Sequence, residues 1–263
     1  MLLPREHGAW GMLLIPFAAA CLLAGRWTSD LLVALLAVLV VFVLRQPLIV
    51  VGRQRWVWRD PRPETELARR DLLWEIPLLA GCGLWLAVSL PLIPLLLLGG
   101  MAAGLTGIAV WMTLHNRQRS LWLQLASAFG LGSSALLVSL VSTHQFETWA
   151  WWLWIFCSLH SLSGVLTVHA RLDQMASARN PRLQEQARRM RWGAAAAALA
   201  QLALGAAVAG ANWPYAIPFV FSGLLHLVEL WRIHKPEPLK RVGFRALAIS
   251  LLHATASVAV LAR

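Results

Sequence analysis

Charge is scarce in this sequence. Asp, Glu, Lys and Arg together make up 13% of the 263 residues, hydrophobic residues make up 59%, and the mean hydropathy is +0.63. A soluble domain typically carries about 25% charged residues and lacks repeated apolar runs long enough to cross a bilayer. These values exclude an ordinary soluble protein. They predict an all-α fold, a polytopic transmembrane helical bundle.

Cysteine and lysine are also rare. Cys21, Cys82 and Cys157 all fall inside apolar runs, and none forms a Cys-x-x-Cys pair. We therefore interpret them as small packed hydrophobic residues. Only two lysines stand against 21 arginines, and alanine and leucine are abundant. That composition favours the product of a GC-rich bacterial gene.

Nine apolar segments divide the chain into predicted spans. Most reach the roughly 17–25 residues that a helix needs to cross a bilayer core. We expect one integral-membrane domain, 1–263, in which the loop spacing suggests two four-helix sets (1–120 and 121–240) and a last helix (241–263). The segments lie near 9–25, 31–50, 72–90, 92–114, 121–141, 149–169, 193–210, 215–233 and 244–261.

Two of the predicted connections are long, 52–70 and 170–192. Short connections dominate in compact proteins, so we expect functional or lid segments there. In the second connection, Leu183, Ala187 and Met190 share a helical face among arginines. This pattern suits either a surface helix on the anionic inner leaflet or a solvated basic loop.

Positive charge is distributed unevenly along the chain. The formal net charge is +11, and all Lys and Arg except Arg26 and Arg263 lie at the N-terminus or in alternate loops and the adjoining span ends. Positively charged loops stay in the cytoplasm. We predict a multi-pass protein of the bacterial cytoplasmic (inner) membrane with its N-terminus in the cytoplasm and its C-terminus outside. The expected partner is the lipid bilayer and not nucleic acid, because the charge follows topology.

The opening stretch 4–16, PREHGAWGMLLIP, places charged residues directly before an apolar run. If a helix begins near Pro4, the side chains of Glu6, His7 and Trp10 point into one sector. They would form either a functional mouth or an ordinary interfacial helix start. The stretch resembles the opening signature of the YwiC-like family of bacterial membrane proteins. That resemblance implies a membrane protein and no particular chemistry.

Polar residues at the predicted cytoplasmic ends of several spans form the candidate ligand site. Arginine with histidine suits a phosphate or another anion, because guanidinium pairs with planar oxyanions through two hydrogen bonds. The alternative is that these arginines only fix topology and extend toward the interface. The candidates are Glu6, His7, Trp10, Arg45, Gln46, Asp71, Glu75, His115, His169, Arg171 and Asp173.

Asp71 and Glu75 are four residues apart, so both carboxylates lie on one helical face. Such a pair could hold Mg²⁺ together with substrate phosphates. It could equally neutralise Arg69 and Arg70 and complement the helix dipole.

A second group of ionisable residues lies deeper: His160, His226, Glu229 and His253. Ionisable residues inside a membrane are expected to be functional. Three histidines near mid-depth could ligate a haem or a metal ion. Hydrogen bonds to hydroxyl groups on neighbouring helices would satisfy them equally well.

Two short motifs show a fainter resemblance, to the UbiA-type intramembrane prenyltransferases. His169-Ala170-Arg171-Leu172-Asp173 is similar to the beginning of that family's second aspartate motif, and Arg45-Gln46-Pro47-Leu48 looks like the stretch after its first. The resemblance implies nine helices and an active site at the cytoplasmic face. The chain departs from it, because the segment near 31–50 has no Asn-Asp-x-x-Asp and Asp173 lacks the following aspartates. Diphosphate bound through Mg²⁺ needs those carboxylates.

The leading functional hypothesis is an inner-membrane protein whose cytoplasmic-face pocket binds an amphipathic anionic ligand, such as a lipid or quinone precursor. It could be a divergent transferase, and no catalytic residue is assigned. The alternatives are a small-anion transporter and a haem- or metal-binding redox protein. If Arg45 and Asp173 line one pocket, they act there together.

Overall fold

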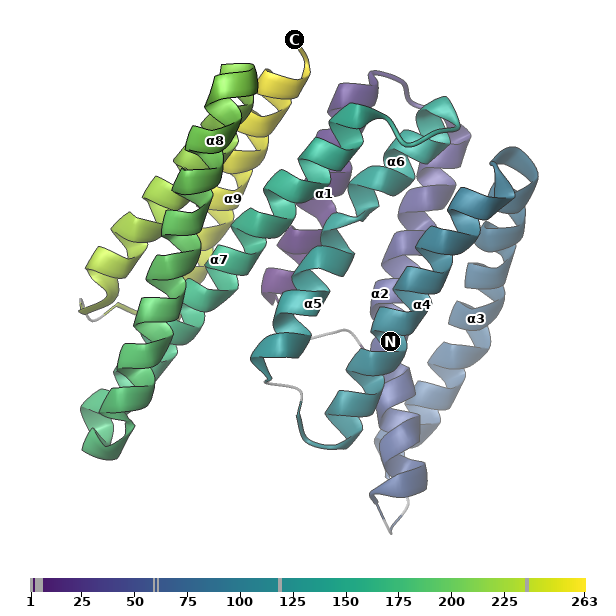
Figure 1. The fold of residues 1–263 in the computed structure, drawn as a ribbon. Coiled ribbons are helices and arrows are strands. Elements are labelled where there is room, and N and C mark those ends of the chain that lie inside the picture. Colours follow the sequence, from purple (N-terminus) through teal and green to yellow (C-terminus); the bar gives the residue numbers. More distant parts are fainter. Residues whose placement is uncertain (1, 3–6, 59, 61, 118–119, 235–236) are drawn as a thin grey trace.

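A computed structural model describes the chain except for residues 1, 3–6, 59, 61, 118–119 and 235–236. The described residues form helices and short connections, without a strand (Figure 1). The helices are α1 (His7–Ala24), α2 (Ser29–Trp56), α3 (Pro63–Ser89), α4 (Leu92–Leu114), α5 (Leu121–Gly132), α6 (Ser134–Thr143), α7 (Thr148–Arg179), α8 (Gln184–Trp231) and α9 (Leu239–Leu261). Single 3₁₀ turns, Pro181–Leu183 and Arg232–His234, flank α8.

Local sequence sets several helix starts. The Thr28 side chain accepts a hydrogen bond from the Leu31 backbone N–H at 3.3 Å and caps α2. Ser120 caps α5 in the same way through the Leu123 N–H, also at 3.3 Å. Proline opens α3 at Pro63. These are preferred residues for helix starts, because they satisfy or remove backbone donors that have no partner within the helix.

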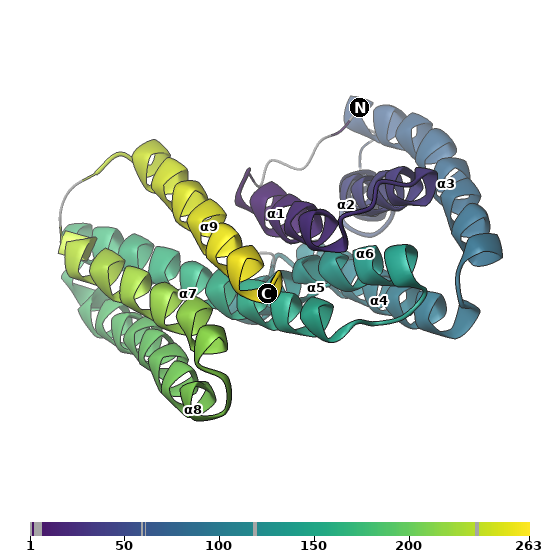
Figure 2. The ribbon, with the colours of Figure 1, turned by 90° about the horizontal axis from the view of Figure 1, so that it is seen from above.

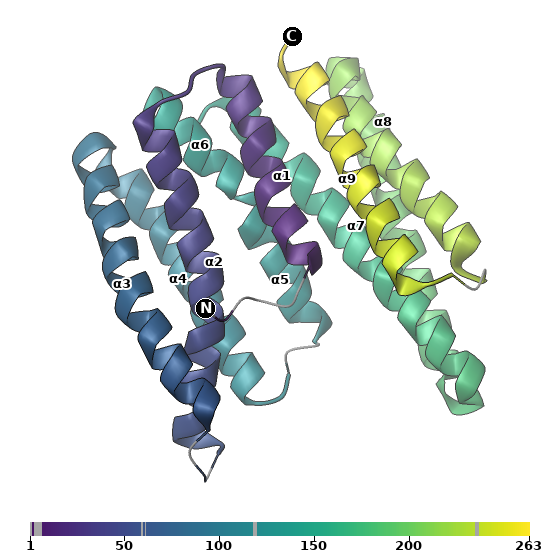
Figure 3. The ribbon, with the colours of Figure 1, turned by 180° about the vertical axis from the view of Figure 1, so that it is seen from behind.

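The helices form two neighbouring groups, α1–α6 and α7–α9 (Figure 2). Helix α7 packs on α5, and α1 packs on α9, which joins the groups (Figure 3). The α2–α3, α4–α5, α7–α8 and α8–α9 connections lie at one end of the bundle, with the start of α1. We call this the basic end, because arginines occupy the last turns of α2 and α7 and the turn after α8.

Helix α8 is bent back on itself at Asn212, whose φ of −152° and ψ of 91° are not helical. Two glycines show that its arms pack antiparallel. A Cβ added at Gly205 would lie 2.9 Å from a methyl carbon of Val220, and one at Gly223 would lie 2.8 Å from the Ala198 carbonyl oxygen. The small residues therefore allow the close approach of the two arms.

Seven helical stretches are long and apolar enough to cross a membrane. They are α2, α3, α4, α5 with α6, α7, α8 with its flanking turns, and α9; the described part of α1 is a shorter apolar helix, Gly8–Ala24. The predicted all-α bundle of membrane-spanning helices is thus confirmed at this level. The number of crossings and the orientation stay predictions.

The main core lies between α1, α2, α6 and α7. Leu31, Leu140 and Leu153 are fully buried there, and the Ser134 hydroxyl donates to the Leu13 carbonyl oxygen at 3.1 Å. Helices α3 and α4 instead bury few of their apolar side chains. Such a surface suits contact with lipid, where exposed apolar side chains carry no penalty.

The prediction of two long loops is wrong. Helix α2 continues to Trp56 and α3 begins at Pro63, while α7 continues to Arg179 and α8 begins at Gln184. Charged residues end the apolar segments but not the helices, because Arg, Glu and Gln are good helix formers. No long lid segment remains at either place within the described residues.

Neither alternative for Leu183, Ala187 and Met190, a membrane-surface helix or a solvated basic loop, describes the packing of this stretch in the structure. Ala187 is only 3% exposed, and Met190 packs against the buried cluster around Leu166 and Ala170. Part of this face of α8 therefore packs on protein.

Candidate functional site

The predicted ligand residues fall into two groups at the basic end. The first lies between α1, α2 and α3. The rings of Trp10 and Phe42 meet edge to face with centroids 4.7 Å apart, and the Arg45 guanidinium carbon lies 5.9 Å from the centre of the Phe42 ring. This places Trp10 and Arg45 around one aromatic side chain.

Arg45 lies level with the two carboxylates of α3. Helices α2 and α3 are antiparallel, as the hydrogen bonds Thr65–Gln54 (2.9 Å) and Trp85–Asp30 (2.8 Å) show. That register puts residue 45 beside the turn that contains Asp71 and Glu75. An Asp71 carboxylate oxygen accepts a hydrogen bond from the Leu2 backbone N–H at 2.7 Å, so the chain start docks here.

Glu75 is the buried carboxylate of this group. It is 5% exposed, and neither carboxylate oxygen has a hydrogen-bond partner among the described residues. A buried carboxylate without partners is costly. Glu6 lies outside the described residues, and the side chain of His7 is not described either.

The second group lies on α7, where three predicted residues contact three different elements. His169 Nε2 is 2.9 Å from Gln124 Oε1 on α5. Arg171 pairs with Glu237 at 3.2 Å, and Asp173 accepts a hydrogen bond from Gln186 on α8 at 3.4 Å. His169 and Asp173 are four residues apart and lie on one face of α7, whereas Arg171 points to the opposite side of that helix.

The remaining predicted residues lie elsewhere. His115 follows α4, is exposed, and has Nδ1 2.8 Å from the Trp111 carbonyl oxygen. Gln46 is half-buried on α2. Arg45 belongs to the first group and Asp173 to the second, so their joint action stays a prediction.

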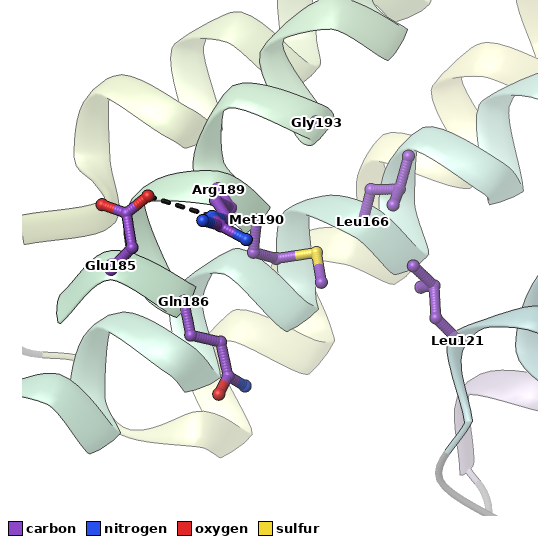
Figure 4. Close-up of a pocket in the computed structure, with 7 residues that line it drawn as sticks. All are labelled: Leu121, Leu166, Glu185, Gln186, Arg189, Met190 and Gly193. Carbon is purple, nitrogen blue, oxygen red and sulfur yellow. Dashed lines mark hydrogen bonds and ion pairs between the residues drawn. The ribbon is translucent and has the colours of Figure 1, made fainter. Parts of the chain in front are cut away.

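A groove opens between α5, α7 and α8, with a volume of about 550 Å³ (Figure 4). Leu121, Leu166 and Met190 line one side, and the side chain of Met190 points toward the two leucines. Glu185, Gln186 and Arg189 form the polar side, and Gly193 also lines the groove. The groove therefore joins an apolar wall to a charged rim.

Sequence reasoning missed this groove. Residues 185–192 fell in a predicted connection, in which the helical face considered was that of Leu183, Ala187 and Met190 and not the face that lines the groove. The available signal was the spacing of Gln186, Met190 and Gly193, which lie three or four apart and share one helical face.

A cluster of ion pairs connects α7, α8 and α9 at the basic end. Arg171, which is 4% exposed, pairs with Glu237 and donates to the Arg232 carbonyl oxygen at 3.0 Å. Arg245 pairs with Glu237 at 2.7 Å and with both oxygens of Glu229 at 2.7 and 2.8 Å. The hydrogen bond from Arg245, and then that from Arg171, lower the pKa of Glu237. Glu237 and Arg245 were not among the predicted site residues.

The three deeper histidines lie together, as their predicted depth allowed. The rings of His160 and His253 are stacked, with centroids 4.3 Å apart and planes 9° apart. The His226 ring lies 4.9 Å from that of His160. Among the described residues, however, no group of three or more His, Cys, Asp or Glu side chains is placed to hold a metal ion. Imidazole lone pairs lie in the ring plane, so face-to-face rings do not converge on one ion.

Comparison with known proteins finds the family that the opening stretch 4–16 resembles. Neither the curated proteins nor the solved structures include a match to the chain. A family model described as YwiC-like protein matches residues 3–139, just over half of the 263 residues. The match begins at the charged opening stretch and continues through α1–α5 into α6. The chain therefore belongs to the YwiC-like family.

Proposed function

We propose that this membrane protein binds an amphipathic anionic ligand, a lipid or a lipid-like precursor, in the groove between α5, α7 and α8. The observation that carries the proposal is the groove itself, in which an apolar wall of Leu121, Leu166 and Met190 adjoins Arg189. Its volume of about 550 Å³ falls within the range of roughly 300–1,000 Å³ that is common for small-molecule sites. An apolar tail fits the wall, and an anionic head fits the rim.

The proposed topology brings this groove to the cytoplasmic leaflet. The bend at Asn212 divides α8 into two arms, and α1 adds a shorter span. Together with the other long helices, these give nine crossings. Arginine at the basic end then faces the cytoplasm of a bacterial inner membrane, with the C-terminus outside.

Charge at the groove favours an anion. Arg189 pairs with Glu185 at 2.9 Å, but both side chains are largely exposed, at 80% and 62%. Such surface pairs contribute about 0–1 kcal/mol, so a phosphate could displace Glu185. Arg188 and Arg191 lie beside Arg189 on the chain and add to the local positive potential.

Lipid retention tests the proposal. The purified protein is mixed with equal amounts of an anionic and a zwitterionic phospholipid, and bound lipid is measured by native mass spectrometry. A Cβ added at Gly193 meets no atom within 4 Å, so Gly193→Leu fills the groove without a backbone clash. We expect Gly193→Leu to abolish selective retention of the anionic lipid. Arg189→Ala should weaken it roughly tenfold, which is the loss of about one charge-assisted hydrogen bond.

Two matched variants serve as controls. Gly81→Leu also places a side chain in open space, but on α3. Arg188→Ala removes the same charge from α8 at a residue that does not line the groove. Both should bind like the wild type. Equal retention by Gly193→Leu and Gly81→Leu would show that the groove is not the lipid site.

A further inference from the structure

His160, His226 and His253, which we call the histidine stack, contain two buried nitrogens without a hydrogen-bond partner among the described residues. His253 is 1% exposed and His226 is 4% exposed. His253 Nδ1 and His226 Nε2 have no hydrogen-bond partner among the described residues. Buried polar atoms are usually satisfied, and an exception within a membrane-spanning bundle calls for an explanation.

The hydrogen bonds of His253 assign its proton. His253 Nε2 lies 3.2 Å from the Phe156 carbonyl oxygen, which can only accept, so Nε2 carries the hydrogen. In the neutral ring Nδ1 is then an unprotonated base with a free lone pair. His160, between the other two rings, contacts the Ser222 hydroxyl at 2.9 Å and the Ser250 hydroxyl at 3.1 Å. Both hydroxyls can donate or accept, so His160 can change tautomer in place.

A cluster of charged groups lies on the basic-end side of this stack. Glu229 lies one turn from His226 on α8 and is held by Arg245, which lies on α9 with His253. Arg171 on α7, Arg232 after α8 and Glu237 complete the cluster. Helices α1, α5 and α6 also pack on this unit. Their described side chains include no acidic or basic group apart from the exposed His144 after α6, and the side chain of His7 in α1 is not described.

An aromatic cluster covers the other side of the stack. The Phe156 ring lies 5.0 Å from that of Phe219, and Trp152 stacks on Tyr215 at 5.1 Å. These residues come from α7 and from the second arm of α8. Such a layer excludes water and separates the histidines from the opposite end, and Glu229 is the charged side chain nearest to them along α8.

We propose that His160, His226 and His253 form a proton-binding site inside the α7–α8–α9 unit, and that protons reach it from the basic end past Glu229. The lone pair of His253 Nδ1 or His226 Nε2 takes up the proton. The only bond that breaks is the one between that proton and the carrier that delivers it. The five charged groups sum to one excess positive charge, so the rings are neutral at neutral pH and charge on acidification. A proton site with access from one side is the element that a proton-coupled carrier requires.

Nitrogen NMR of histidine-labelled protein in nanodiscs tests the site directly. At neutral pH we expect His253 as the Nε2–H tautomer. On acidification, one proton per chain should enter the stack while the protein remains folded. His253→Gln keeps a donor for the Phe156 carbonyl but removes the titrating nitrogen, so this uptake should be lost. The control is His144→Asn, at an exposed residue with φ of 60°, a conformation that Asn tolerates.

The route past Glu229 is tested with matched acidic variants. Glu229→Gln removes the carboxylate nearest to the stack along α8, so we expect the proton affinity of the histidines to fall about tenfold, and Glu229→Asp should restore most of it. Glu64→Gln, at an exposed residue that begins α3, should have no effect. The proposal is overturned if the three rings keep neutral signals until the protein unfolds. Wild-type proton affinity in Glu229→Gln would likewise overturn the route.

Discussion

Glu237 joins two arginines from different helices, Arg171 of α7 and Arg245 of α9. Arg171 is almost fully buried, so the loss of this carboxylate leaves a guanidinium with less compensation than before. The ion pairs therefore hold α7, α8 and α9 together at the basic end. We call this cluster of Arg171, Arg232, Arg245, Glu229 and Glu237 the clamp. It also supplies the charges that face the histidine stack.

The clamp makes stability depend on pH in a defined window. The pKa of Glu237 is lowered below its ordinary value of 4.5, mainly by Arg245 and then by Arg171. A carboxyl group whose pKa is lower in the folded state stabilises the fold when the pH is above the ordinary pKa. This contribution to the free energy of unfolding is lost as the pH falls through the folded-state pKa. Denaturant unfolding in detergent should thus show wild type more stable than Glu237→Gln at neutral pH. The two should converge well below pH 4.5. A difference that stays constant into that acidic range would contradict the clamp.

For single residues, a position inside an apolar helix was predictable, but the neighbouring side chains were not. The positions of His160, His226 and His253 within apolar segments placed them near mid-membrane, and the structure brings them together. The same reasoning put His169, Arg171 and Asp173 in one pocket. In the structure, Arg171 points away from the other two, because two residues along a helix turn about 200°. His169 and Asp173 share a face of α7, but they contact different helices, α5 and α8.

At the scale of elements, the antiparallel arms of α8 depend on glycine. A Cβ at Gly223 would meet the Ala198 carbonyl oxygen at 2.8 Å and Leu202 at 2.8 Å, whereas one at Gly104 on α4 meets nothing within 4 Å. Overpacking costs about 1–3 kcal/mol. Ala at an open helical position instead stabilises by up to about 1 kcal/mol.

The two alanine variants should therefore change the free energy of unfolding in opposite directions. Gly223→Ala should lower it by roughly 1–3 kcal/mol, and Gly104→Ala should leave it unchanged or raise it slightly. Reversible unfolding in mixed micelles measures both. Equal effects would mean that the arms of α8 are not packed as closely as described.

Helices were predictable from apolar segments, and their ends were not. The apolar runs near 92–114 and 244–261 closely match α4 and α9. Charged stretches were interpreted as loops because hydropathy marks the membrane boundary and not the end of a helix. Residues 184–192 continue as helix beyond that boundary, and this extension forms the polar side of the groove.

For the whole molecule, the distribution of arginine predicts the orientation. An alkaline phosphatase fused after Gln145, in the α6–α7 connection, should be active if that connection faces outward as predicted. A fusion after Asn180, between α7 and α8, should be inactive. The reverse pattern would overturn the assignment of the basic end to the cytoplasm. The UbiA-like bundle and the two four-helix sets stay predictions.

The central claim is that the groove at the basic end selects an anionic amphipathic molecule. A photoreactive amino acid replaces Met190 in the groove or, as a lipid-facing control, Leu84, which is 70% exposed on α3. Each variant is illuminated in nanodiscs that contain anionic and zwitterionic phospholipids in equal amounts, and the captured lipids are identified. We predict that the residue at position 190 captures mostly anionic lipid, whereas the residue at 84 captures both in their bulk proportion. The same proportion at both positions would contradict the claim.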